Sequence, residues 1–150
     1  MVNEFTGKFS FLSNFHDSPI LFDSDGEHSF IAPTVEHYFQ ASKTPNFEEA
    51  LNIIGASTPG QAKRLGRRCM LRSDWEETKD VVMKQALILK FQEPELREKL
   101  LQTGDKYLKE GNWWHDNYWG SCYCSKCGDR GRNKLGQLLM EVRRDIQEGR

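Results

Sequence analysis

The sequence lacks the features that would place it in a membrane or on nucleic acid by bulk charge. No stretch comes near the roughly 20 apolar residues that a membrane-spanning helix requires, and the first fifteen residues lack the basic region and apolar run of a secretory signal. With 21 basic and 22 acidic residues, neither sign of charge is in clear excess. Any nucleic-acid contact therefore has to be local. We expect a cytoplasmic protein with no membrane segment.

Cysteine is scarce and unevenly placed. The chain has four cysteines, and three of them crowd together as Cys122, Cys124 and Cys127, unlike the spaced pairs of a secreted disulfide framework. Three thiolates could bind zinc, with Cys69 or His115 as a distant fourth ligand, but a structural zinc site normally shows two separated pairs. We therefore predict no metal and no cofactor for catalysis, and keep the three cysteines as zinc candidates.

No repeat, low-complexity tract or linker interrupts the 150 residues. This length, with 37% hydrophobic residues, suits one ordinary domain with one core, so we predict a single domain over residues 1–150. In the first third, short strands are predicted at residues 9–11, 20–22 and 29–31. The last two strands are joined by turn residues 23–27 and predict a hairpin.

Beyond the hairpin the hydrophobic pattern becomes helical. Capping residues precede four of the helical segments: Thr34, Asn46, Thr58 and Ser73. A shorter helix is predicted from Pro94 to near Gly104, and a final one carries the apolar stripe from Leu135 to Ile146. The run 75–91 is apolar around much of its circumference, which predicts a central helix. Together these patterns predict an α+β fold, mainly helical, with a small antiparallel β element from the N-terminal third.

One flank of the first predicted helix carries three groups that can take part in chemistry. At about 100° per residue, Glu36, Gln40 and Lys43 fall in one narrow sector. A lysine amine beside a carboxylate in a partly dry cleft can lose its proton and attack an electrophilic carbon. For an arbitrary Glu and Lys seven residues apart, a weak exposed ion pair is the default interpretation. His37 points elsewhere, and we predict that it is a structural histidine bonded to backbone.

Between residues 106 and 131 the periodic pattern gives way to a long loop rich in Trp, Gly and Cys. Loops of this length inside compact domains are usually functional or disordered. Asp116 lies here among the aromatic residues Trp113, Trp114, Tyr118 and Trp119. A carboxylate among aromatic faces suits a stacked ring with a polar anchor, and the alternative is an aromatic cluster packed over the core.

Two local groups of residues could contact an anion. Residues 128–133 precede the last helix and could aim backbone N–H groups and arginine side chains at a phosphate, or they could form a linker with Asn133 as the helix cap. A basic patch also lies on the third predicted helix, where a solvated face is the default interpretation. Its members are Lys63, Arg64, Arg67 and Arg68, and Arg67 is the one that we expect near an anionic ligand.

Several motifs together resemble the NADAR (YbiA-like) family, and they span nearly the whole chain. In order they are Leu12-Ser13-Asn14-Phe15, Glu36-His37-Tyr38 with Gln40 and Lys43, Ala62-Lys63-x-x-Gly66-Arg67, Leu71-Arg72-x-Asp74-Trp75, Lys90-Phe91, Asp116-Asn117-Tyr118-Trp119-Gly120 and Leu135-Gly136-x-Leu138-Leu139-Met140. The resemblance implies an N-glycosidase that cleaves the bond between a ribose-type sugar and a nitrogen base. Substrates linked to the family include phosphorylated riboflavin-pathway intermediates and ADP-ribose attached to guanine. For this protein we predict the removal of ADP-ribose from a guanine of nucleic acid.

The resemblance also implies roles for individual residues. Breaking an N-glycosidic bond requires stabilising positive charge at the anomeric carbon and a proton transfer. We predict that Glu36 handles the proton, that Lys43 attacks the anomeric carbon to give an imine that water hydrolyses, and that Asp116 fixes a ribose hydroxyl or assists water. The predicted substrate contacts are Asn14, Phe15, Gln40, Arg67, Trp75, Trp119 and Asn133.

Two other classes of function fit the same residues. A module that binds ADP-ribose or a small nucleotide without cleaving it would use the same aromatic and basic groups, and it would bind stoichiometrically without releasing a base. A zinc-stabilised nucleic-acid interaction domain built on Cys122, Cys124 and Cys127 would contain metal and bind with strongly salt-dependent affinity. The even charge balance makes this last class the least favoured.

Overall fold

The computed structural model describes residues 1–23 and 26–150, so Ser24 and Asp25 of the predicted hairpin turn lie outside the described residues. The chain forms two compact units. One is Asn14–Lys90, here called the central unit, and the other combines Met1–Ser13 with Phe91–Arg150, here called the terminal unit. The single domain over residues 1–150 stays a prediction. In the described residues, no helix is both long and apolar enough to cross a membrane.

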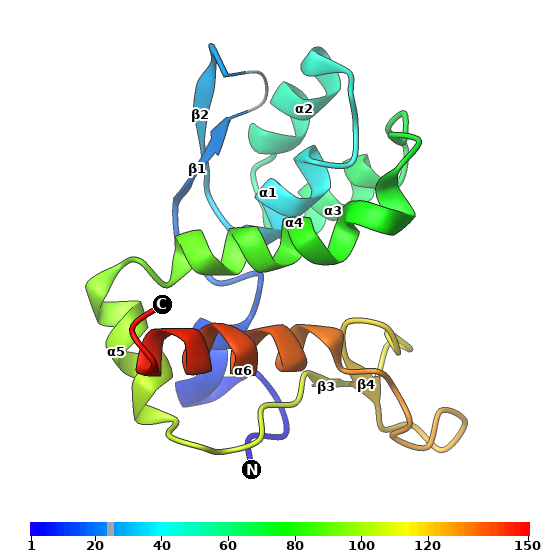
Figure 1. Ribbon diagram of the computed structural model, residues 1–150. Coiled ribbons are helices and arrows are strands. Elements are labelled where there is room, and N and C mark those ends of the chain that lie inside the picture. Colours follow the sequence, from blue (N-terminus) through cyan, green and yellow to red (C-terminus); the bar gives the residue numbers. More distant parts are fainter. Residues whose placement is uncertain (24–25) are drawn as a thin grey trace. The chain divides into compact units, whose positions relative to one another are not determined.

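The central unit begins with a small antiparallel hairpin (Figure 1). Strand β1 (Ile20–Asp23) pairs with β2 (Ser29–Ala32), with Ile20 opposite Ala32. Ile20 and Phe22 are buried while their neighbours along β1 are exposed, which is the alternation of a strand covered on one face. The hairpin confirms the α+β class and the antiparallel element predicted from the N-terminal third.

Four helices complete the central unit: α1 (Val35–Ala41), α2 (Phe47–Ile54), α3 (Pro59–Gly66) and α4 (Trp75–Lys90). The predicted caps of the first three are confirmed, because Thr34, Asn46 and Thr58 each accept a hydrogen bond from the backbone N–H three residues later. Helix α1 packs against the other three helices and all its residues except Tyr38 are buried. It is therefore the packed centre of this unit.

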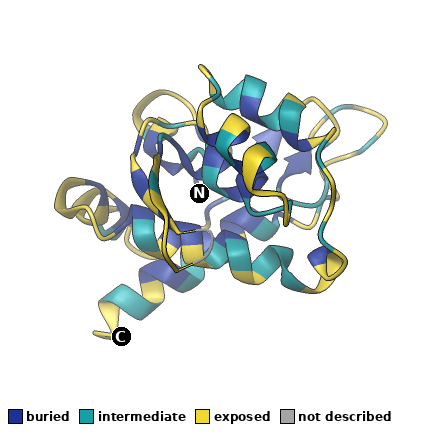
Figure 2. Cartoon of the chain, turned by 90° about the horizontal axis from the view of Figure 1, so that it is seen from above, coloured by how far each residue is buried: buried dark blue, intermediate teal, exposed yellow. Residues whose placement is uncertain are grey.

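Helix α4 is less enclosed than its apolar sequence suggests. Its buried residues include Met83, Ala86 and Leu87, whereas Val81 is 65% exposed and Ile88 is 44% exposed. The same separation of buried and exposed sides recurs along the helices in Figure 2. The prediction that α4 is the central helix therefore does not hold within the central unit, where α1 has that place.

The terminal unit contains a 3-10 helix η1 (Gly7–Leu12), helices α5 (Pro94–Gln102) and α6 (Lys134–Gln147), and two very short strands, β3 (Gly111–Asn112) and β4 (Ser121–Cys122). The strand predicted at residues 9–11 is wrong, because these residues belong to η1, which buries Phe11 and Leu12. Strands β3 and β4 pair in parallel. The last helix is confirmed, and its buried stripe includes Leu135, Leu138, Leu139 and Val142.

The first residues of the chain are tied to the segment that leads into β3. Val2 forms a parallel bridge with Leu108, and its N–H and C=O bond Tyr107 O and Lys109 N at 2.9 Å each. The N–H of Gly111 then donates to Asn3 O at 3.1 Å. These backbone bonds fix the start of the long loop that was predicted between residues 106 and 131.

Lys90, the last residue of α4, is only 1% exposed. Burial lowers its pKa from the ordinary value of 10.5 to about 7, because an ammonium group loses its hydration in the interior. Over that range of pH the unfolded chain binds the proton and the folded chain does not. The free energy of unfolding therefore rises as the pH increases from about 7 towards 10.

We expect a Lys90→Met variant, which keeps a long side chain but removes the amine, to lose this pH dependence. Its stability relative to the wild type should fall by up to roughly 1.4 kcal/mol for each pH unit between 7 and 10. Urea unfolding of both proteins at pH 7, 8, 9 and 10 measures the difference. Parallel stability curves would show that Lys90 is charged in the folded protein.

Candidate functional site

The first candidate site lies on one flank of α1 in the central unit. Glu36 and Gln40 are 7% and 4% exposed, and Gln40 Nε2 donates a 2.8 Å hydrogen bond to Glu36 Oε1. Helix α1 ends at Ala41, so Lys43 lies just beyond the helix, whereas the sequence had predicted it within the helix. Its position is still fixed, because its N–H donates to Gln40 O at 3.2 Å and its C=O accepts a 2.7 Å bond from Arg72 N–H.

The Lys43 amine is shifted toward the neutral form. Burial lowers the pKa of Lys43 and is the largest influence on it. The charges of Glu36 and Cys69 raise this pKa, those of Arg67 and Lys63 lower it, and the net shift is downward. The Nζ atom lies 5.9 Å from the ring centre of Phe39. A lysine with a lowered pKa has a larger neutral fraction near neutral pH, and the neutral amine is the nucleophilic form.

Two side-chain oxygens in the described residues are buried without a hydrogen-bond partner: Asn14 Oδ1 and Gln40 Oε1. Asn14 is next to α1, because its C=O accepts a 3.1 Å bond from Glu36 N–H. A buried polar atom without a partner costs about 1–3 kcal/mol, so such atoms in a native fold indicate a missing donor or a functional role. Both are acceptors, and hydroxyl or amine hydrogens of a ligand would satisfy them.

Gly66 allows α3 to approach the Gln40 side chain closely. A Cβ atom at this position would overlap Gln40 Oε1, so only glycine fits the observed packing. The same close approach of α3 brings the positive charges of Lys63 and Arg67 into the range at which they lower the pKa of Lys43. Helical spacing alone does not connect Lys63 and Gly66 with the α1 flank, although both belong to the motif Ala62-Lys63-x-x-Gly66-Arg67.

Cys69 follows α3 and lies near the same flank. Its thiol donates to Gly66 O at 3.2 Å, and burial, followed by the charge of Glu49, raises the pKa of this thiol. It belongs to the central unit, where the structure gives it a hydrogen-bonding role beside Lys43. The sequence analysis considered it only as a distant zinc ligand.

The other predicted contacts in the central unit differ in exposure. Phe15 is 47% exposed, and Arg67 is an exposed residue at the C-terminal cap of α3. Trp75, in contrast, is 5% exposed and packs on Phe39 with ring centres 5.0 Å apart. Trp75 is therefore a core residue that supports α1, and its predicted contact with the substrate stays a prediction.

His37 has the structural role that was predicted for it. The residue is 1% exposed, and Nε2 lies 2.9 Å from Ala56 O while Nδ1 lies 2.8 Å from Thr34 Oγ1. Since a carbonyl only accepts, Nε2 carries the proton and Nδ1 accepts from the threonine hydroxyl. Both ring nitrogens are thus occupied in holding the start of α1.

A cavity of about 520 Å³ opens on a different side of α1. Tyr38, Ala41 and Ser42 contribute from α1, and Phe22 and Arg72 line it from other elements. Burial, followed by the charge of Asp23, raises the pKa of Tyr38. Neither Glu36, Gln40 nor Lys43 lines this cavity, so these three groups and the cavity belong to separate surfaces of the helix.

A second group of predicted residues lies in the terminal unit, in the loop between β3 and β4. Asp116 Oδ1 accepts hydrogen bonds from the N–H groups of Tyr118 at 3.2 Å and Trp119 at 3.0 Å. The backbone of Asp116 is held in turn by Asn112, whose Oδ1 and Nδ2 bond its N–H at 3.1 Å and its C=O at 2.9 Å. One carboxylate oxygen therefore builds the turn, and Oδ2 takes no part in these bonds.

Asn112 is the residue of this loop that the sequence analysis missed. It is 1% exposed, and it also accepts a 3.3 Å bond from Trp114 N–H. Buried amides that bond several backbone groups carry no periodic signal in a sequence. An asparagine at the entry to a loop rich in Trp and Asp is the feature that points to such a role.

The aromatic residues around Asp116 fall into an exposed and a packed pair. Trp113 and Trp114 are 65% and 50% exposed, whereas the rings of Tyr118 and Trp119 meet edge to face at 4.8 Å. The guanidinium of Arg132 lies 5.5 Å above the ring of Tyr118. The aromatic cluster is therefore partly packed and partly open, and Trp119 belongs to the packed pair.

Asn133 was predicted to contact a phosphate, which stays a prediction, and the structure shows the bonds that its side chain makes within the protein. It is 2% exposed, its Nδ2 donates to Leu108 O at 2.9 Å, and its Oδ1 accepts from Glu110 N–H at 2.9 Å. It stands at the N-cap position of α6 in a left-handed conformation, but its side chain makes no cap bond. Asn133 instead joins the start of α6 to the segment before β3.

The sequence and the fold match known proteins. The family model described as the NADAR domain matches residues 3–147. An N-glycosidase of Nostoc punctiforme is 42% identical over 120 residues, which cover 76% of this chain and 74% of that protein. The N-glycosidase YbiA of Escherichia coli is 43% identical over 117 residues, covering 76% of this chain and 70% of YbiA.

Two further comparisons concern the fold and a second kind of relative. The NMR structure of E. coli YbiA superposes with a TM-score of 0.78 at 35% identity and covers 99% of this chain and 88% of that chain. A riboflavin biosynthesis protein of Vibrio vulnificus is 36% identical over 155 residues, covering 91% of this chain and 41% of that protein. The chain thus has the mainly helical α+β fold of the YbiA type. It belongs to the NADAR family.

Proposed function

We propose that this protein is an N-glycosidase that hydrolyses the bond between a phosphoribose or ADP-ribose group and a nitrogen base. The proposal depends on one observation at the α1 flank. Lys43 has a lowered pKa there and lies close enough to the buried Glu36 for their charges to interact. The relatives named N-glycosidase support the same reaction class. A solvated ion pair would need neither buried groups nor a lysine shifted toward its neutral form.

In the proposed reaction, neutral Lys43 Nζ attacks the anomeric carbon and the bond from this carbon to the base breaks. Glu36 accepts the proton that Lys43 gives up on becoming neutral, and it passes this proton to the leaving nitrogen. The lysine nitrogen then loses a proton and forms an imine as the sugar ring opens, with a proton passing to the ring oxygen. Water adds to the imine carbon, and the Lys43 amine leaves as the free sugar is released.

The remaining residues of the central unit offer binding groups. The unpartnered acceptors Asn14 Oδ1 and Gln40 Oε1 are suited to ribose hydroxyl groups, which donate hydrogen bonds. Arg67 is exposed and positively charged, so it is suited to a phosphate. Phe15 is exposed and offers a ring face to a base. For the terminal unit, we propose that Asp116 Oδ2 holds a hydroxyl or directs water and that Trp119 contacts a ring.

Two substrate classes follow from the relatives and from the family. Relatives named as riboflavin biosynthesis proteins, from Vibrio vulnificus and Zea mays, favour a phosphorylated riboflavin-pathway intermediate. The family resemblance favours the second substrate class, which is ADP-ribose attached to guanine in nucleic acid. Since the chain has 21 basic and 22 acidic residues, binding to nucleic acid would depend on a local patch such as Lys63, Arg64, Arg67 and Arg68.

The test is to incubate the protein with each substrate and to follow released base and released sugar by mass spectrometry. A double variant, Glu36→Gln with Lys43→Ala, prepared in the same way, controls for contaminating enzymes. Equal amounts of free base and free sugar from the wild type alone would establish the activity and its substrate class. Stoichiometric retention of either substrate with no release would instead identify a binding module.

Replacing Gly66 with alanine should impair the reaction without unfolding the protein. The added methyl group would overlap Gln40 Oε1 and push the amide away from Glu36, which would then lose its 2.8 Å bond from Gln40. We expect turnover to fall by about 100-fold, the scale of a misplacement of about 1 Å.

Gly60→Ala is the matched control for this substitution, because it lies on the same helix and its Cβ would meet only Thr58 Oγ1 at 3.9 Å. It should leave turnover within about twofold of the wild type, since changes outside special positions have small effects. Circular dichroism shows whether both variants keep their helices. Similar activity in the two variants would mean that the Gln40 amide does not matter for turnover.

A further inference from the structure

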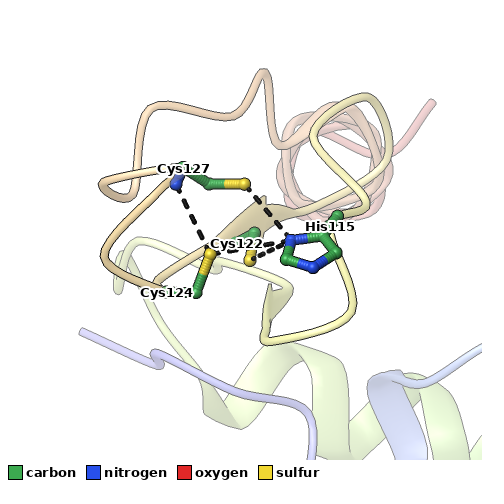
Figure 3. A group of neighbouring side chains, drawn as sticks. All are labelled: His115, Cys122, Cys124 and Cys127. Carbon is green, nitrogen blue, oxygen red and sulfur yellow. Dashed lines mark hydrogen bonds between the residues drawn. The ribbon is translucent and has the colours of Figure 1, made fainter.

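Four potential metal ligands meet in the terminal unit, and they are different residues from those to which we assign a part in the reaction. His115, Cys122, Cys124 and Cys127 place their ligand atoms within 4.8 Å of one another. Figure 3 shows the three thiols and the imidazole converging on one point between them. Cys122 belongs to β4 and is fully buried, so the cluster is anchored in a strand on one side.

The distances in this cluster match those between ligands of one tetrahedral ion. The three sulfurs lie 3.6, 3.6 and 3.4 Å from His115 Nδ1. With zinc bonds of about 2.3 Å to sulfur and about 2.05 Å to nitrogen, a tetrahedral site separates nitrogen from sulfur by about 3.6 Å. The distances from the imidazole nitrogen to the three sulfurs are therefore already those that a bound ion would require.

Hydrogen bonding alone does not explain why three sulfurs surround one nitrogen. In a neutral imidazole, Nδ1 either donates one hydrogen or offers one lone pair, so it can form a good bond to only one of the three thiols. A cation at the centre would satisfy all four groups at once. Cys₃His is one of the ligand sets of closed structural zinc sites.

The backbone is also shaped to present these ligands. Gly128 has a φ of 65°, and its N–H donates to Cys124 O at 2.8 Å, which folds Cys124 and Cys127 into a tight turn. Within this turn the N–H of Cys127 donates to Cys124 Sγ at 3.4 Å, a contact that supports a negatively charged sulfur. Then Asp129 N–H donates to Cys122 O at 2.8 Å, which brings the turn onto β4.

His115 completes the set through an uncommon backbone conformation. Its φ is 71°, in the left-handed region that non-glycine residues rarely adopt without a compensating interaction. The next residue is Asp116, whose backbone is held by Asn112. A metal bond to His115 would therefore fix the residue that directly precedes Asp116.

We propose that His115, Cys122, Cys124 and Cys127 bind one zinc ion in a structural site that fixes the loop between β3 and α6. The four protein ligands close the coordination shell, which leaves no open position for water or substrate. The site stabilises the fold of the loop and takes no part in breaking the glycosidic bond. The proposal builds on the three cysteines that the sequence left as zinc candidates, and it adds His115 as the fourth ligand.

The experiment measures metal content and not turnover, so its result is independent of the proposed reaction. The full chain is purified without chelator and without an affinity tag that binds metal, and zinc is measured by mass spectrometry. We expect one zinc per chain. Replacing zinc with cobalt should give the strong visible bands of tetrahedral cobalt with a thiolate charge-transfer band.

Variants test the ligand set and separate a metal site from a folding defect. His115→Ala should weaken zinc binding by more than about 100-fold, beyond the loss caused by an outer-shell partner, whereas His115→Cys should retain one zinc through four thiolates. Cys69→Ser is the control, because Cys69 lies outside the cluster and should leave the zinc content unchanged. Mass spectrometry of the denatured protein also shows whether Cys124 and Cys127 form a disulfide with each other.

Three results would overturn the proposal. The first is protein without zinc that also fails to take up cobalt when its thiols are reduced. The second is a disulfide between Cys124 and Cys127 in protein purified under reducing conditions. The third is full zinc binding by a Cys124→Ser, Cys127→Ser double variant, since this would place the metal elsewhere.

Discussion

Lys43→Ala is expected to abolish release of the base while leaving the fold intact. The side chain is the proposed nucleophile, and alanine cannot form the imine on which the scheme depends. The backbone of Lys43 makes the structural bonds, to Gln40 O at 3.2 Å and from Arg72 N–H at 2.7 Å, and these survive the substitution. Full activity in this variant, with normal circular dichroism, would remove the imine mechanism.

The covalent intermediate can be trapped directly. Sodium borohydride reduces an imine to a stable amine, so the wild type incubated with substrate and borohydride should gain the mass of the sugar moiety on the peptide that contains Lys43. Lys43→Ala should gain nothing. A trapped adduct on another lysine of the same protein would keep the imine chemistry but reassign the nucleophile.

Lys63→Ala is the matched control for this experiment, because the Lys63 charge lowers the pKa of Lys43 without taking part in the reaction. The variant should still be trapped at Lys43. Removing a nearby positive charge makes protonation of Lys43 easier, so the pKa of Lys43 rises. Activity depends on the neutral amine, and the rise of activity with pH should therefore move to higher pH in Lys63→Ala.

Much of the fold follows from local signals that the sequence contains. Capping residues such as Thr34 and Asn46 mark helix starts because their side chains satisfy N–H groups that the helix leaves open. The two short apolar runs that flank the turn residues 23–27 mark the hairpin in the same way. The strand predicted at residues 9–11 failed because the short alternation Phe9-Ser10-Phe11 fits a 3-10 turn as well as a strand.

The sequence predicted the candidate site only where its residues lie on the same helix. Glu36 and Gln40 share a helical flank, and helical spacing is enough to bring them together. The influence of Lys63 on Lys43 and the fit of Gly66 against Gln40 depend on how α3 packs on α1, which no spacing within one helix encodes. The burial of Trp75 and Asn133 likewise comes from tertiary contacts, and both residues had been expected at the ligand.

The zinc candidates also could not be completed from the sequence alone. The spacing of Cys122, Cys124 and Cys127 indicates three ligands at most, and a fourth cannot be chosen from sequence because the loop has no regular structure. The fold selects His115 through backbone bonds to Asn112 and a left-handed residue. Both are set by the tertiary structure and leave no local pattern.

Glu36→Gln is expected to lower turnover by about 10²- to 10⁴-fold, the usual contribution of a positioned general acid or base. The change keeps the size of the side chain, and the new amide oxygen can still accept the bond that Gln40 Nε2 now donates at 2.8 Å. The loss would therefore report the missing proton transfer and not a collapsed site. Glu48→Gln, an exposed position on α2, is the control and should keep wild-type turnover.

The leaving group distinguishes a proton donor from a purely electrostatic role of Glu36. A substrate whose base leaves as a stable anion needs no proton on departure, so Glu36→Gln should cleave it at nearly the wild-type rate. The charge of Glu36 also raises the pKa of Lys43, so removing it leaves more of the amine neutral and does not weaken attack. An equal loss of turnover with good and poor leaving groups would contradict the role of Glu36 as general acid and would point instead to stabilisation of positive charge on the sugar.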